Sequence, residues 1–343
     1  MVRLDSTGDV LLAGPAIRAV AAAARVVLLA GPRGRAAAAL LPDVTDVIEW
    51  RCPWIDPEPP AVSHDDLLAL ADAVRRQNFS QAVILTSFHQ DPLPAALLLR
   101  MAGVPHITAA SPDYPGSLLD VRHLLPDTGL HEVERMLSVT AAAGFPPPAD
   151  TRLRLRAPLP DACSLLGAIG TGADRPREYI VVHPGASVPA RAPLPERCAE
   201  YVAALARDGW PVVVTGSPEE APLTRRVAAG SALDLGGMTS LAGLATVIAG
   251  AAAVVTGNTG PAHLAAAVGT PVVSLFAPTV PLERWRPWRV PHTVLGAQDA
   301  PCAGSRAREC PLPGHPCLAA VSADLVTAAV RQLTETQSLE VCA

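Results

Sequence analysis

The chain alternates between short, continuous apolar runs and longer segments in which apolar residues recur every three or four positions. The first pattern is typical of buried parallel strands, and the second of helices that cover both faces of a sheet. In the first half the predicted strands are residues 1–5, 25–31, 46–50, 81–88 and 104–111, with helical segments that include 8–24, 63–77 and 91–103. The pattern therefore predicts an α/β fold.

A Pro- and Gly-rich stretch, residues 146–176, interrupts this alternation and is the best candidate for a linker. Beyond it, strands are predicted at 179–185, 210–217, 232–237, 252–258 and 270–278, with helices at 194–209, 218–230, 240–251, 259–269 and, after a capping residue, 322–337. We expect two doubly wound, Rossmann-like domains that face a central cleft, with a hinge near residue 170.

The expected division of the chain has three parts. Residues 1–165 form an N-terminal domain and residues 166–320 a C-terminal domain. Residues 321–343 form a C-terminal helix that could pack back on the first domain.

Composition narrows the class of protein. Half of the 343 residues are hydrophobic, 17% are charged, the net charge is −5, and no long basic run occurs. This balance excludes a disordered chain and disfavours a nucleic-acid-binding surface, although a local arginine site stays open. The N-terminal segment has acidic Asp5 and Asp9 ahead of its apolar stretch, and no apolar span of about 20 residues follows. We expect a cytoplasmic enzyme, with peripheral membrane contact left open.

Cysteines cluster near the C-terminus. Cys302, Cys310 and Cys317 lie close in sequence, with His315 beside them, but their spacing contains no CxxC pair. Free thiols in a reducing compartment are the interpretation that we prefer over a metal site or a disulfide pair.

Candidate chemistry follows the predicted strands, where ligands of open α/β sheets bind. In "DSTGDV" Gly8 permits a tight strand-to-helix turn, and Asp9 either caps the helix or offers a carboxylate that can accept a proton. After the strand at 179–185, Ser187 and Arg191 lie in a loop that suits a phosphate, although Arg191 could equally be a solvent-exposed arginine.

Two further segments carry polar groups. Glu219 and Glu220 follow the strand at 210–217, where an acid can bond ribose hydroxyls or complement a helix dipole. In "GNTGPAHLAAAVGTP" a helix begins at Thr259 and Gly260, and its free N–H groups form an anion site. His263, one turn later, either donates to the same anion or is a structural histidine.

At these four places together the chain resembles the ADP-heptose:lipopolysaccharide heptosyltransferase family, glycosyltransferase family 9. The resemblance runs from "RLDSTGDVLLAGPAIRA" to "HPCLAAVSADLVTAAV", and its most specific parts are "HPGAS", "GSPEE" and the stretch from "GGMTSLAGL" to "VVSLFAPT". It implies the GT-B fold, with an N-terminal acceptor domain and a C-terminal nucleotide-sugar domain. It also implies an inverting transferase that uses no metal ion and no cofactor.

The resemblance also implies roles for residues. Asp9 matches the general base that takes the proton of the acceptor hydroxyl. Arg191 falls near the diphosphate, and Ser187 lies in the same loop toward the phosphate or sugar. Glu220 aligns with the acid that bonds the ribose, and Met238 with a residue that lines the adenine pocket.

The helix start matches the family's diphosphate-binding segment. Thr259, Gly260 and His263 take these positions, so that His263 and Arg191 would neutralise the leaving group in place of a divalent ion. Asn258 stands where several members of the family carry Asp, which changes a contact to the sugar hydroxyls.

The acceptor side matches the family least. Its segments "TSFHQDPLPAALLLRMAGVP" and "SPDYPGSLLDVRH" are similar to an actinobacterial branch, whose organisms generally lack lipopolysaccharide. We therefore expect a different glycan or a small natural product as acceptor. The candidate residues for its pocket are Gly8, His89, Gln90, Asp113, Tyr114 and His123.

The leading hypothesis is a transferase that moves a heptose from ADP-heptose to a hydroxyl or amine. The alternatives are a related GT-B enzyme, with another donor or acting as a 2-epimerase, and a non-catalytic protein that binds nucleotide sugars. Hydride chemistry is disfavoured because no GxGxxG follows a predicted strand.

Overall fold

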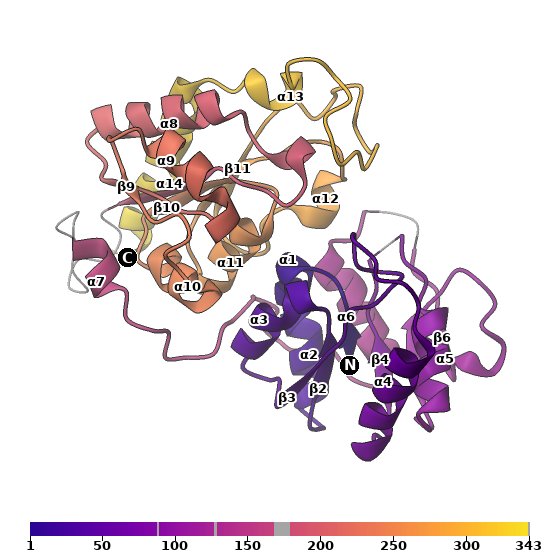
Figure 1. Ribbon diagram of the computed structural model, residues 1–343. Coiled ribbons are helices and arrows are strands. Elements are labelled where there is room, and N and C mark those ends of the chain that lie inside the picture. The colour runs from indigo at the N-terminus through magenta and orange to yellow at the C-terminus, as the bar shows by residue number, and fades with distance from the viewer. Residues whose placement is uncertain (88, 127–128, 168–178, 342–343) are drawn as a thin grey trace. The chain divides into compact units, whose positions relative to one another are not determined.

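The computed structural model divides into two compact units, residues 1–156 and 157–343 (Figure 1). It describes residues 1–87, 89–126, 129–167 and 179–341, with only the backbone at 163 and 336–341. The division falls between Arg156 and Ala157, ahead of the boundary expected at 165, and the hinge expected near residue 170 lies outside the described residues.

The first unit is built on one parallel sheet. Its strands are β1 (Val2–Arg3), β2 (Val27–Ala30), β3 (Asp46–Glu49), β4 (Ala82–Ile84), β5 (Ile107–Ala110) and β6 (Val121–His123), in the order β3-β2-β1-β4-β5-β6. Its helices are α1 (Thr7–Leu12), α2 (Gly14–Ala21), α3 (Pro32–Leu40), α4 (His64–Arg76), α5 (Leu93–Met101) and α6 (Glu132–Ala142), with a 3₁₀ turn η1 (Gly116–Leu118). Helix α1 packs on α3 and α2 on α6, while α4 packs on α5.

Local sequence explains one difference from the prediction. The helix expected over 8–24 is two helices, which meet at Ala13. Pro15 lies in the first turn of α2, where its missing N–H does no harm, whereas it would break a hydrogen bond inside a longer helix. Strand β6 and helix α6 were not predicted by the hydrophobic pattern.

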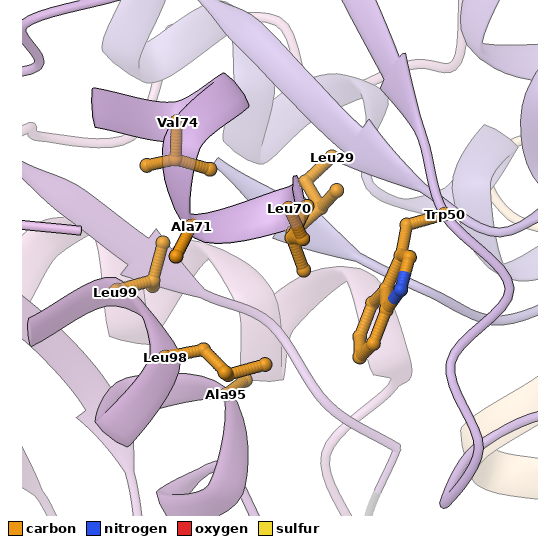
Figure 2. A pocket seen from close by; sticks show the side chains of 8 residues that line it. All are labelled: Leu29, Trp50, Leu70, Ala71, Val74, Ala95, Leu98 and Leu99. Atoms are coloured by element: carbon orange, nitrogen blue, oxygen red, sulfur yellow. The ribbon is translucent and has the colours of Figure 1, made fainter. Parts of the chain in front are cut away.

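The core of the first unit includes an apolar pocket between α4, α5 and the sheet (Figure 2). Its lining is Leu29, Trp50, Leu70, Ala71, Val74, Ala95, Leu98 and Leu99. None of these residues carries predicted chemistry, and all are buried. The pocket therefore belongs to the packing of the unit.

The second unit repeats the architecture. Its strands are β7 (Ile180–His183), β8 (Val212–Val214), β9 (Leu233–Asp234), β10 (Ala253–Gly257), β11 (Val272–Leu275) and β12 (His292–Leu295), all parallel, in the order β12-β11-β10-β7-β8-β9. The helices are α7 (Cys163–Leu166), α8 (Pro195–Arg207), α9 (Ala221–Ala228), α10 (Leu241–Ala249), α11 (Gly260–Val268), α12 (Leu282–Trp285), α13 (Pro316–Ala319) and α14 (Ala323–Val341), with 3₁₀ turns η3 (Pro189–Arg191) and η4 (Pro218–Glu220).

Helix α14 completes the second unit. It packs against α8 and the second sheet, and Val326, Val330 and Leu333 are buried in the core of that unit (Figure 1). Helix α14 thus belongs to the second unit, whereas residues 321–343 were expected as a segment apart from both domains. The apolar face of this amphipathic helix is buried in the core of its own unit. In the described part of the chain, no helix combines the length and apolar character that a membrane span requires.

Each sheet has one switch point. Both follow the order 3-2-1-4-5-6 of the Rossmann fold, in which the chain moves outward from the first strand and then returns to its other side. The switch point lies between β1 and β4 in the first unit, and between β7 and β10 in the second. The doubly wound α/β prediction is thereby confirmed, and these are the edges where ligands are expected.

Candidate functional site

In the second unit the loops after β7 and β10 touch at the switch point. A Cβ atom on Gly257, the last residue of β10, would lie 2.6 Å from the carbonyl oxygen of Arg191. Only a residue without a side chain permits this approach. The structure thus brings Arg191 beside the segment that precedes α11, although the two are far apart in sequence.

The start of α11 presents hydrogen-bond donors. Thr259 is the N-cap residue, and its Oγ1 is buried with no hydrogen-bond partner among the described residues. Gly260 begins the helix, and Pro261 has no N–H. The Ala262 N–H donates to the Thr259 carbonyl at 3.1 Å, so Gly260 supplies the first backbone donor of the helix. His263 lies in the next turn and is 5% exposed. The positive end of the helix dipole and these donors suit an anion.

Asn258 adds a directed donor at the same place. Its Oδ1 accepts a hydrogen bond from the Ala277 backbone N–H at 3.2 Å, and an N–H can only bond the oxygen of the amide. The Nδ2 group therefore points elsewhere, and it is buried without a partner in the described ranges. A buried, unpaired amide costs about 1–3 kcal/mol, so a ligand that accepts this hydrogen bond recovers that free energy.

Glu220 packs against the β7 loop. A Cβ on Gly185 would overlap its carboxylate at 1.9 Å, and its Oε2 accepts a hydrogen bond from the Ser217 N–H at 2.8 Å. His183 lies beside it, with Nε2 at 3.7 Å from Oε2 and Nδ1 at 3.0 Å from Thr215 Oγ1. Burial lowers the pKa of His183, against the opposing effect of Glu220. The Glu220 side chain stays 23% exposed, which leaves part of the carboxylate open to a hydroxyl group.

The two remaining donor-side candidates are on the surface of the second unit. Met238 follows β9 and is 59% exposed, an unusual position for a large apolar side chain. Ser187 lies exposed in the β7 loop. Both are accessible to a ligand at the carboxyl edge of the sheet.

In the first unit a buried arginine organises the switch point. Arg3 is fully buried in β1, and its Nη2 donates hydrogen bonds to Asp9 Oδ1 at 3.0 Å and to Ser87 Oγ at 3.1 Å. Its Nε lies 3.2 Å from Asp5 Oδ2. Burial would lower the pKa of Arg3, but the two aspartates and the nearby Glu132 raise it, so the guanidinium is charged.

Asp9 is both a helix cap and an accessible carboxylate. Its Oδ2 accepts hydrogen bonds from the Ser6 N–H at 3.3 Å and from Ser6 Oγ at 2.7 Å, as in a capping box. Its side chain is 16% exposed. The two interpretations of Asp9 are therefore compatible, because the capped carboxylate keeps a face that a ligand can reach.

Asp5 differs from Asp9 in its environment. Burial raises the pKa of Asp5 to about 6, while Arg3 opposes the shift. Gln90 donates a hydrogen bond to Asp5 Oδ1 and accepts one from the Ser87 N–H at 2.9 Å. Residues from the loops after β1 and β4 thus form one polar network.

The acceptor-side candidates divide into three that are at least partly buried and three that are exposed. Gly8, buried in α1, and Gln90 lie in or next to the Arg3 network. His123, at the end of β6, has its Nε2 at 3.1 Å from Ser138 Oγ, and burial lowers its pKa.

The other acceptor-side candidates are exposed: His89, Asp113 and Tyr114, the last at 85%. The network also contains Arg3, Asp5 and Ser87, which sequence reasoning missed. A charged residue inside a predicted strand was the available signal for Arg3, since a buried charge needs partners.

The cysteines whose side chains the structure describes are free thiols: Cys52, Cys198, Cys302, Cys310 and Cys317. Cys302 and Cys317 are buried, and burial raises the pKa of Cys317 to about 11. Within the described residues no group of His, Cys, Asp and Glu is arranged to hold a metal ion.

Comparison with known proteins identifies the family. The sequence model of glycosyltransferase family 9 (heptosyltransferase) matches residues 67–315. The chain belongs to this family. Lipopolysaccharide heptosyltransferase 3 of Escherichia coli is 30% identical over 183 residues, which are 48% of this chain and 50% of that protein. The match thus spans about half of the length of this relative.

Solved structures share the fold over the whole chain. ADP-heptose LPS heptosyltransferase II of E. coli superimposes with a TM-score of 0.75 at 21% identity, covering 98% of both chains. An E. coli heptosyltransferase in complex with ADP gives 0.65 at 20% identity, covering 97% of both. The family resemblance and the two-domain α/β architecture inferred from the sequence are confirmed.

Proposed function

We propose that this family 9 protein is an inverting, metal-independent transferase that moves a heptose from ADP-heptose to a hydroxyl or amine of a glycan or small molecule. The observation that carries the proposal is the set of unpaired donors at the switch point of the second unit. Asn258 Nδ2 and Thr259 Oγ1 lie at the start of α11, where the β7 loop with Arg191 touches β10.

These groups suit a departing diphosphate. In the proposed reaction the acceptor oxygen or nitrogen bonds the anomeric carbon, the bond from that carbon to the diphosphate oxygen breaks, and ADP leaves with the electron pair. Arg191, His263 and the N-terminus of α11 stabilise the negative charge that develops on it. They take the place that a divalent cation has in other transferases.

Asp9 supplies the base. Arg3 and Ser6 fix its carboxylate, and its exposed face accepts the proton of the attacking hydroxyl or amine. Asp9 belongs to the first unit and the anion site to the second.

The nucleotide assignment is supported by the outer part of the site. Glu220 offers a partly open carboxylate to ribose hydroxyls, and exposed Met238 offers an apolar surface to adenine. One of the structural neighbours was solved with ADP bound. We propose a cytoplasmic enzyme whose acceptor is a glycan or small natural product, with peripheral membrane contact left open.

A calorimetric titration with ADP, UDP and GDP, each with and without Mg²⁺, tests the proposal. We expect selective binding of ADP with an affinity that Mg²⁺ does not change. A preference for UDP or GDP would overturn the donor assignment. ADP-heptose consumption that releases nucleotide without any acceptor would favour an epimerase-like enzyme, and nucleotide-sugar binding without any turnover would favour a binding protein.

Gly257→Ala should weaken ADP binding by at least about tenfold. The new methyl group would lie 2.6 Å from the Arg191 carbonyl, which is backbone, so the β7 loop must move away from α11. The loss of one charge-assisted hydrogen bond to the diphosphate is sufficient to lower the affinity for ADP tenfold. The measurement is the dissociation constant of ADP by calorimetry.

Gly243→Ala is the matched control for this prediction. It adds the same methyl group to α10 of the same unit, where the nearest atom is Ser240 Oγ at 3.5 Å, an ordinary contact. We expect unchanged ADP affinity for this variant. Equal affinities for both variants would contradict the assignment of Arg191 to the donor site.

A further inference from the structure

The connection from β12 to α13 folds over the carboxyl edge of the second sheet. We define residues 297–318 as the cap segment. Its two ends meet where the Ala297 N–H donates to the Cys317 carbonyl at 3.0 Å. Between them, the N–H groups of Gly304 and Arg306 each donate at 2.8 Å, to the carbonyls of Pro278 and Thr279. The cap segment is therefore anchored to the loop that follows β11.

The cap segment also holds the β7 loop, at Ala190. The Ala190 N–H donates to the Arg308 carbonyl at 2.9 Å, and His315 Nε2 lies 3.1 Å from the Ala190 carbonyl oxygen. Because a carbonyl only accepts, the Nε2 atom carries the proton. Ala190 is 1% exposed, so the cap segment supplies both hydrogen bonds that its buried backbone groups require.

The backbone of the cap segment is shaped for this contact. His315 has φ 52° and ψ 54°, the left-handed region, and Gly314 before it has φ 73°. Left-handed backbone is uncommon outside glycine, although histidine is among the residues that adopt it most readily. The conformation places the imidazole in the interior, where it is 7% exposed.

Ala190 immediately precedes Arg191, whose carbonyl oxygen lies against Gly257 at the end of β10. The position of the Arg191 backbone relative to α11 is therefore fixed on two sides, by β10 and by His315 through Ala190. Within the loop, the Arg191 N–H donates to the Val188 carbonyl at 2.9 Å, which shapes the 3₁₀ turn η3 but does not attach it to the rest of the unit.

We propose that His315 is a positioning residue for donor binding, which holds the β7 loop so that Arg191 faces the anion site at the start of α11. This inference rests on the proposed function of that site. His315 acts through the backbone of Ala190 and does not itself contact the donor. Loss of its N–H leaves the Ala190 carbonyl buried without a donor, and the loop relaxes toward solvent to regain one.

The test compares His315→Gln with His315→Met. Both side chains are flexible and of similar volume, and both meet the same left-handed backbone, but only glutamine keeps a hydrogen-bond donor. We expect His315→Met to weaken ADP binding by about tenfold, the effect of one buried carbonyl left unpaired. We expect His315→Gln to remain within about twofold of the wild type. The measurement is the dissociation constant of ADP by calorimetry on the full chain.

His292→Met is the matched control. His292 Nδ1 also lies within hydrogen-bond distance of a backbone carbonyl, that of Val290 at 2.9 Å. His292, however, begins β12, so it lies at the amino edge of the sheet and not at the carboxyl edge, where the cap segment lies. This variant should keep the ADP affinity of the wild type even if its melting temperature falls. A similar loss of affinity in His292→Met and His315→Met would show a general effect of destabilisation and would overturn the proposal.

Amide hydrogen exchange in residues 188–192 gives a second measurement that needs no nucleotide. We expect faster exchange in His315→Met than in the wild type, and recovery in His315→Gln. Equal exchange in all three proteins would overturn the positioning role. If the wild type binds no ADP, the proposed function fails instead, and the exchange rates alone decide whether His315 holds the loop.

Discussion

Asp9→Asn should reduce turnover by about 10²- to 10⁴-fold, the range that a general base contributes, while ADP affinity stays within about twofold. Asparagine keeps the size of the side chain and an oxygen for the cap, but it cannot accept the acceptor's proton at neutral pH. The measurement is the rate of ADP release from ADP-heptose in the presence of an acceptor, together with calorimetry of ADP.

Asp66→Asn is the matched control. Asp66 occupies the same third position of a helix after a serine N-cap, in α4 of the same unit, and it also holds a side-chain hydrogen bond, from Trp50 Nε1 at 2.7 Å. Its replacement should lower stability slightly and leave turnover unchanged. If Asp9→Asn retained near-normal turnover, Asp9 would be a helix cap and nothing more.

The alternation of apolar runs and helical segments was sufficient to predict the fold. The fold class follows from the local periodicity of apolar residues, and parallel strands that are buried on both faces show as continuous apolar runs in the sequence. The location of the candidate residues was also predictable, because Asp9 and the Asn258–His263 segment follow strands that lie at switch points. The family motifs then indicated which of those loops to propose as the base and donor sites.

Contacts between distant segments were not predictable in this way. Arg3 bonds Ser87, and His315 bonds Ala190, across separations for which one sequence gives no register. The role of Gly257 is similar, since its lack of a side chain has meaning only because Arg191 packs against it. In each case the sequence identifies a polar or small residue, but the residue that it contacts is known only from the three-dimensional structure.

The chemistry of the two switch points is complementary. In the first unit, two carboxylates surround one buried guanidinium, and we propose the partly exposed one, Asp9, as the proton acceptor. In the second, the groups without a described partner are donors, the buried Asn258 Nδ2 and Thr259 Oγ1 at the N-terminus of α11. In the proposed reaction the first switch point supplies the base and the second the anion site, and an inverting transfer from an activated sugar to an acceptor requires one of each.

Arg3→Met should lower the free energy of unfolding by about 3 kcal/mol at pH 8, because it leaves Asp5 and Asp9 without their buried counter-ion. We take the lower end of the range for buried ion pairs, since both carboxylates keep some contact with solvent. Arg75→Met is the control: Arg75 pairs with Asp72 on the exposed surface of α4, and its loss should cost less than about 1 kcal/mol. Urea denaturation measures both.

The loss of stability in Arg3→Met should also depend on pH, and the ionisation of Asp5 determines the direction of this dependence. Burial raises the pKa of Asp5 to about 6 even beside Arg3, so without the guanidinium this pKa rises further. An acid whose pKa is higher in the folded than in the unfolded state loses stability as pH rises, and the variant should therefore be closest to the wild type near pH 5 and furthest from it at pH 8. The double variant Arg3→Met/Asp5→Asn should regain part of the loss and most of the pH dependence, because it removes the charge that the methionine leaves unpaired. A single variant whose deficit is the same at pH 5 and pH 8 would mean that Arg3 contributes through packing, and that the carboxylates do not depend on its charge.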